Sequence, residues 1–206
     1  MKQMIKRNEL VVGPKERAIE AIKAGRKQEA IKCIEEFYEE FRPLHDRYGD
    51  WVQSLLGFVS DKLGEEAVEE ALYRTFMDVY KDRAISFKDM RHEDIIRRYC
   101  QSLRSHYSKF YIEEDEEKTV IVITYCGSGG RMQREGKAYR KRTQKNYPWS
   151  FDQAGVSYYC CHEGVFSMAY KELGLDFVRY EYCKQFDDGG KPTGSPCKWI
   201  FYKERQ

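Results

Sequence analysis

The sequence lacks the features that mark several large classes of protein. It has no apolar run near the ~20 residues of a membrane span, and its first residues carry no apolar signal-peptide core. Its 36 Lys and Arg are nearly balanced by 34 Asp and Glu, so a net charge of +2 provides no overall field that attracts nucleic acid. These absences predict a soluble, cytoplasmic protein that is not bound to a membrane.

Several chemical motifs are missing as well. There is no Cys-x-x-Cys pair of the kind that marks a zinc site, no Gly-Lys-Ser/Thr of a phosphate-binding loop, and no spacing typical of an iron–sulfur cluster. The seven cysteines are an odd number. In a reducing compartment they are expected to be free thiols or metal ligands rather than a disulfide framework.

What is present is a chain of 206 residues, 41% of them hydrophobic, which is enough to bury a real core. Apolar residues recur every three or four positions through the first half, which predicts helices. Pro43 is expected to interrupt this pattern, and a last helix is expected from about residue 93 to residue 110. Helical runs are expected over residues 14–25, 31–41, 45–59, 65–76 and 93–110.

The second half has a different character. The acidic run at 113–117 reads as a solvated turn, and residues 127–157 read as loop. Runs rich in β-branched and aromatic residues predict strands at 119–125, 176–182 and 198–202, with a helix over 163–173. The predicted fold class is therefore α+β, with a helical region (1–112) packed in one compact unit on a Cys-rich region (113–206) that holds a small antiparallel sheet and one or two helices.

Five of the seven cysteines lie in this second half. Cys160 and Cys161 precede a predicted helix, whose N-terminal end favours a thiolate. Residues two apart in a strand share a face, so Glu181 and Cys183 are expected side by side, and a hairpin would bring Cys197 close to them. One thiolate from the helix start together with Glu181, Cys183 and Cys197 would suit Zn²⁺. The alternative is buried structural thiols.

This pattern resembles two related families. Cys160-Cys-His-Glu-Gly, Glu181-Tyr-Cys183 and Gly194-Ser-Pro-Cys197 resemble the 4-vinyl-reductase domain, which implies a structural zinc beside a pocket for a small aromatic ligand. The same tail, with Leu44-His-Asp46 and Leu63-Gly-Glu-Glu-Ala67, resembles the L-2-amino-thiazoline-4-carboxylic acid hydrolase family. The resemblance covers residues 35–203. Glu181 precedes Cys183 by two residues rather than three, and the loop to Cys197 is longer than in the sensor proteins.

The turn Cys126-Gly-Ser-Gly-Gly-Arg131 directly follows a predicted strand. The amides of Gly129 and Gly130 can point at a carboxylate, and Arg131 can add a bidentate contact. Cys126 is then a candidate nucleophile or an additional metal ligand. The alternative is an ordinary turn.

A nucleophilic cysteine needs a base, for which the candidates are His162 and His45. His45 lies on an apolar stripe with Tyr48, Val52 and Leu55, so it is expected inside, either as an acid–base group or as a hydrogen-bonded core histidine. His92 and His106 fall among charged residues and are expected at the surface.

The segment 131–145 carries seven basic residues and one acid. It can guide an anionic small substrate or contact phosphates, or it is a solvated loop, and nucleic acid ranks third because the rest of the chain balances the charge. Nearby aromatics, Trp149 and Tyr158 among them, suit a lid over a planar ligand.

The sequence thus predicts a hydrolase-like enzyme that acts on a compact carboxylated or heterocyclic C–N or C–S substrate at a Cys- or metal-centred site. The alternative is a zinc-stabilised module that binds a small aromatic molecule without turnover. The apolar helical stripes exceed what a small sheet needs for cover, so a homodimer through the helices is also expected.

Overall fold

The structure is a computed structural model that describes residues 11–137, 141–184, 191 and 193–204. It divides into two compact units, Met1–Arg47 and Tyr48–Gln206. The first unit holds helix α1 (Pro14–Lys23) and the beginning of helix α2 (Lys27–Leu63). Ala18 and Ala21 of α1 are buried, and Arg17 pairs with Glu36 of α2 at 2.8 Å.

Helix α2 corrects the predicted break at Pro43, because it continues through this residue to Leu63. A proline inside a helix removes one backbone hydrogen bond, and α2 stays helical on both sides of Pro43 despite this loss. The predicted inner stripe is also wrong in the second unit. Val52 and Leu55 are exposed, whereas Gln53 and Leu56 are buried.

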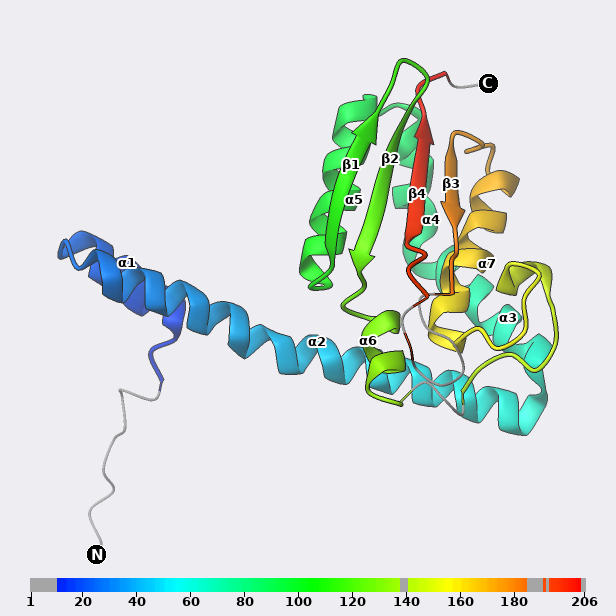
Figure 1. The fold of residues 1–206 in the computed structure, drawn as a ribbon, viewed down its shortest axis with the longest axis horizontal. Helices are drawn as coiled ribbons and strands as arrows, with labels where there is room; N and C mark the ends of the chain where they lie inside the picture. The colour runs from blue at the N-terminus through cyan, green and yellow to red at the C-terminus, as the bar shows by residue number, and fades with distance from the viewer. Residues whose placement is uncertain (1–10, 138–140, 185–190, 192, 205–206) are drawn as a thin grey trace, which may run out of the picture. The chain divides into compact units, whose positions relative to one another are not determined.

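The second unit continues with further helical segments and then a sheet (Figure 1). The helical segments before the sheet are α3 (Glu65–Thr75), the π-helix η2 (Phe76–Tyr80), α4 (Lys81–Ile85), the 3₁₀ turn η3 (Ser86–Lys88) and α5 (His92–Ser105). The strands are β1 (Lys109–Glu114), β2 (Lys118–Tyr125), β3 (Val178–Glu181) and β4 (Cys197–Tyr202). The remaining helical segments are α6 (Gly129–Arg134), the 3₁₀ turn η4 (Pro148–Ser150) and α7 (Tyr158–Glu172).

The four strands form one antiparallel sheet in the order β1-β2-β4-β3, which confirms the α+β prediction. In Figure 1, α5 and α7 lie on the same side of this sheet. Tyr99 of α5 joins them, because its ring lies 4.7 Å from the rings of Trp199 and Phe201 and its hydroxyl lies 3.1 Å from that of Tyr170. The core is therefore an aromatic layer between helices and sheet.

Three further elements differ from the sequence prediction. Helix α5 ends at Ser105 rather than near residue 110, because Tyr107 takes a left-handed conformation with φ of 55°. Residues from Lys109 then form strand β1, so the expected acidic turn begins inside that strand. The region predicted as loop also contains the short helix α6.

Candidate functional site

Strand register brings two of the distant cysteines to one end of the sheet. Ile123 of β2 pairs with Cys197, the first residue of β4. Cys126 follows Ile123 by three residues and therefore leaves the sheet at the same end. Cys160, in the first turn of α7, interacts electrostatically with both Cys126 and Cys197. We call this group, with the tyrosines beside it, the cysteine–tyrosine cluster: Cys126, Tyr159, Cys160, Tyr180, Tyr182 and Cys197.

The two adjacent cysteines of α7 have different surroundings. Cys160 lies near the Gly-rich turn, with the side-chain amide of Gln133 3.9 Å from its sulfur. Cys161 is fully buried, and burial raises the pKa of its thiol, a shift to which the charge of Glu65 adds. Cys160 is therefore the member of the pair that belongs to the cluster, and Cys161 is a core residue.

Cys197 is held by the ends of strand β3 and the chain that follows it. The Cys183 amide donates to the Cys197 sulfur at 3.4 Å, and the Cys197 thiol donates to the Cys183 carbonyl at 3.3 Å. Tyr180 also bonds to Cys197. Because Tyr180 faces Cys197, Glu181 points to the opposite face of the strand, where it lies 3.9 Å from Arg179. The structure thus brings together the predicted cysteines but not the predicted acidic ligand.

In the described part of the chain, no group of three or more His, Cys, Asp or Glu side chains is arranged to hold a metal ion. The donor set expected for zinc is therefore incomplete among these residues, because Glu181 points away and Cys161 lies in the core. The zinc site stays a prediction, and no chemical step is derived through it.

Burial keeps most thiols of the cluster protonated. It raises the pKa of Cys197 to about 11, against a hydrogen bond from Tyr180 that lowers it. Burial likewise raises the pKa of Cys160 well above its usual value, and the neighbouring cysteines add to this shift. The expected thiolate at the start of α7 is therefore disfavoured, since desolvation outweighs the helix end.

Cys126 has a more polar environment. It is only partly buried, and the Gly130 amide donates to its sulfur at 3.2 Å. The Arg134 guanidinium donates to its carbonyl at 2.7 Å and stacks on the Tyr125 ring at 3.9 Å. Cys126 is therefore a partly exposed thiol whose sulfur accepts a hydrogen bond from the Gly-rich turn.

The glycines of the turn allow close approach of neighbouring groups. A Cβ at Gly129 would lie 2.3 Å from the Cys160 sulfur, and a Cβ at Gly127 would lie 2.0 Å from the His106 carbonyl oxygen. Only glycine fits these positions without movement of the neighbours. The absence of a side chain at Gly129 thus lets the Cys160 sulfur pack against the turn, and the Gly130 amide donates a hydrogen bond to the Cys126 sulfur.

His106 and Ser128 are site residues that sequence reasoning missed. His106 is partly buried rather than a free surface group, and its Nδ1 lies 2.7 Å from the Ser128 hydroxyl. Ser128 is 6% exposed and also bonds to Tyr159. Ser128 follows Cys126 by two residues in the sequence, so His106 contacts the same Gly-rich turn that carries Cys126. The available signal was the Ser within the Gly-rich turn.

Gln53 is the second missed residue, and it positions the start of α7. Its side-chain oxygen accepts hydrogen bonds from the Tyr159 amide at 2.7 Å and the Ser157 hydroxyl at 3.2 Å, while its amide donates to the Lys141 carbonyl at 2.6 Å. It therefore satisfies a donor that the helix itself cannot pair. No sequence signal pointed to this role, because the equally polar but exposed Ser54 stands beside Gln53.

The two histidines predicted as bases have other partners. His162 bonds to the Tyr159 carbonyl and lies 3.2 Å from Glu163. Burial lowers the pKa of His162, but the charge and hydrogen bond of the Glu163 carboxylate raise it by more, so the net shift of the pKa is upward. His45 belongs to the first unit, where its Nδ1 lies 3.0 Å from Asp46. Their catalytic roles stay predictions.

Arg131, predicted to hold a substrate carboxylate, is 7% exposed and already contacts protein carboxylates. Its guanidinium lies 2.6 Å from Glu135 and 3.5 Å from Asp50, and its Nε donates to the Gly127 carbonyl. These contacts neutralise its charge and tie the turn to helix α2.

Two lysines of the basic segment also pair with acids of α2. Lys137 contacts Asp50 at 2.7 Å, and Lys141 contacts Asp61 at 2.8 Å. Arg140 lies outside the described residues. Acids of α2 thus pair with three basic residues of the segment, Arg131, Lys137 and Lys141, which weakens the case for a phosphate-binding surface.

The two predicted lid aromatics are core residues. Trp149 is 1% exposed and stacks on Tyr147 with ring centroids 4.8 Å apart. Tyr158 is 4% exposed, donates to Glu65 at 2.8 Å and lies 2.8 Å from the Ser60 hydroxyl. In this structure both side chains stabilise the interior rather than face a ligand.

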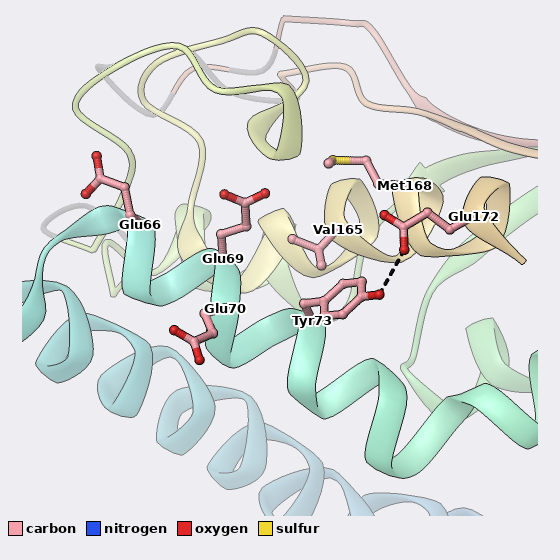
Figure 2. A pocket seen from close by; sticks show the side chains of 7 residues that line it. All are labelled: Glu66, Glu69, Glu70, Tyr73, Val165, Met168 and Glu172. Atoms are coloured by element: carbon pink, nitrogen blue, oxygen red, sulfur yellow. Dashed lines mark hydrogen bonds between the residues drawn. The ribbon is translucent and has the colours of Figure 1, made fainter.

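A pocket of about 250 Å³ lies away from the cluster, between α3 and α7 (Figure 2). Tyr73 in its wall donates to Glu172 at 2.8 Å, and Val165 and Met168 supply apolar surface. Burial raises the pKa of Glu69, as does Glu66. Its four glutamates make it unsuited to a carboxylated substrate: Glu66, Glu69, Glu70 and Glu172.

No family model, curated protein or solved structure matches the chain. The two family resemblances therefore stay predictions. The part of the chain described by the structure contains no helix suited to crossing a membrane.

Proposed function

We propose that the protein is a hydrolase-like enzyme of small-molecule metabolism that uses the Cys126 thiol as its nucleophile. The observation that supports this most directly is the hydrogen bond from the Gly130 amide to the Cys126 sulfur. Cys126 and Cys160 are both partly exposed, but burial raises the pKa of the Cys160 and Cys197 thiols. A thiol reacts as its thiolate, so Cys126 is the favoured nucleophile of the cluster.

In the proposed reaction the Cys126 sulfur bonds to the electrophilic carbon of a C=N or C=O group, whose π electrons move to nitrogen or oxygen. The C–N or C–S bond then breaks, the leaving group takes a proton, and water cleaves the sulfur–carbon bond and restores the thiol. His106 is the proposed proton acceptor, acting through the Ser128 hydroxyl that it contacts. This assignment replaces His45 and His162 as the preferred base.

The direct test is turnover of a panel of small carboxylated thiazolines, thioimidates and amides, followed by mass spectrometry of the products. We expect Cys126→Ala to lower kcat/KM by about 1000-fold or more, since removal of a nucleophile is among the largest single effects. Cys100→Ala, at a buried cysteine of α5, is the matched control and should retain turnover. Equal turnover by Cys126→Ala and the unchanged protein would rule out the nucleophile.

The second candidate is a binding module for a small aromatic molecule, stabilised by zinc and without turnover. It is favoured by the aromatic groups near the thiols, where Phe151 and Tyr182 stack with centroids 4.8 Å apart. Elemental analysis distinguishes the two. About one zinc per chain, together with unfolding of Cys183→Ser or Cys197→Ser, would support the binding module.

The remaining proposals concern setting and partners. We propose a small-molecule substrate, a cytoplasmic location and a homodimer. We rank nucleic acid last because the net charge is only +2 and because Lys137 and Lys141 of the basic segment pair with acids. The dimer is independent of the chemistry at Cys126.

A further inference from the structure

Helix α2 carries a broad apolar surface that the fold leaves exposed. From Ile31 to Phe58 its sequence follows four heptads without a break in register. Eleven of the twelve positions in three columns of this repeat are apolar, and His45 is the twelfth. These columns form what we call the α2 seam: Ile31, Ile34, Phe37, Tyr38, Phe41, Leu44, His45, Tyr48, Trp51, Val52, Leu55 and Phe58.

The apolar side chains of the seam are between 41% and 59% exposed. All of them lie on the single helix α2, which runs from Lys27 to Leu63. The buried positions of the same helix are different ones, such as Gln53 and Leu56. The apolar residues of the seam therefore do not form part of the hydrophobic core.

The seam is large enough for a stable protein interface. Large aromatic side chains bury about 150–250 Å² each, so eleven half-exposed residues of this general size offer on the order of 1,000 Å² of apolar surface per chain. A standard interface buries about 800 Å² per partner. The largest apolar patch of a typical monomer is only about 300–600 Å².

We infer that a second copy of this chain covers the α2 seam. A heptad repeat of apolar residues is the pattern by which helices pair with one another. Because two copies of the chain carry the same seam, each can cover the seam of the other in a symmetric dimer. Gly57 and Pro43, the residues least suited to a helix, fall at the heptad position farthest from the seam and leave the contact surface uninterrupted. The side chain of His45, the polar member, is only 9% exposed and lies 3.0 Å from Asp46, so it adds little to the contact surface.

The test is the mass of the full chain in solution, measured by light scattering over a concentration series. We expect twice the monomer mass at micromolar concentration. Leu55→Glu and Phe41→Glu, one in each unit, should each raise the dimer dissociation constant by at least about 100-fold, since two buried side chains are lost per dimer. Ser54→Glu is the control, because it adds the same charge to an exposed neighbouring position outside the seam.

Circular dichroism checks that each variant keeps its helices, and Leu55→Gln serves as a milder variant should a glutamate disturb folding. A dimer that is lost in the seam variants and kept in Ser54→Glu supports the inference. A monomeric unchanged protein, or seam variants that dimerise as well as it does, would overturn it.

Discussion

Replacement of Gly129 by alanine probes the packing that joins the Gly-rich turn to helix α7. An added Cβ would lie 2.3 Å from the Cys160 sulfur, far inside ordinary contact distance. Cys160 sits in the first turn of α7, which is fixed by Gln53, so relief requires another rotamer of the Cys160 side chain or a shift of the helix start or of the turn. Overpacking of this kind costs about 1–3 kcal/mol. We therefore expect Gly129→Ala to lower the free energy of unfolding by that amount.

Gly49→Ala is the matched control. Its added Cβ would meet Arg131 and Met132 at 3.7 Å and 3.8 Å, which is ordinary van der Waals contact, and the residue lies inside helix α2. Alanine is favoured over glycine in a helix by about 1 kcal/mol, so this variant should be more stable than the unchanged protein. Urea unfolding followed by circular dichroism measures both. If Gly129→Ala were as stable as Gly49→Ala, the close contact with Cys160 would be refuted.

Three further predictions concern stability, charge and packing. Gln53→Leu should cost about 1–3 kcal/mol in urea unfolding, because it leaves buried backbone groups unpaired, while the exposed control Ser54→Ala should change stability by less than about 0.5 kcal/mol. Glu163→Gln should lower the pKa of His162 measured by NMR. Because the folded pKa of His162 is raised, its pair with Glu163 stabilises the fold fully below the ordinary His pKa of about 6.5, and this stabilisation is lost as pH rises through the folded pKa. Glu163→Gln should therefore lower the free energy of unfolding more at pH 6 than at pH 9. Gly164→Ala should destabilise the fold, since its Cβ would lie 2.1 Å from the Trp149 carbonyl oxygen, and unchanged stability would contradict that contact.

The sequence was informative where local pattern decides structure. The β-branched run at 119–125 became β2, the aromatic run at 198–202 became β4, and Gly25 closes α1 in a left-handed conformation, as expected. The α+β class followed from these elements. Periodicity also identified the apolar columns of α2, although it could not show which columns face the core.

The site required information that a single sequence does not carry. The pairing of Ile123 with Cys197 depends on strand register, and the outward direction of Glu181 depends on which face Tyr180 occupies. His106 reaches Ser128 because α5 ends earlier than periodicity predicts. Arg131 looked like an anion-binding group because its partner Asp50 lies far away in the sequence.

The most direct test of the proposed chemistry is limited alkylation of the native protein with iodoacetamide, with each cysteine followed by peptide mass spectrometry. Cys126 should be modified first among the cluster cysteines, and Cys160 and Cys197 should react much more slowly because burial keeps them protonated. Modification of Cys126 should abolish turnover in parallel. Modification of Cys160 or Cys197 before Cys126 would contradict the assignment of Cys126 as the reactive thiol.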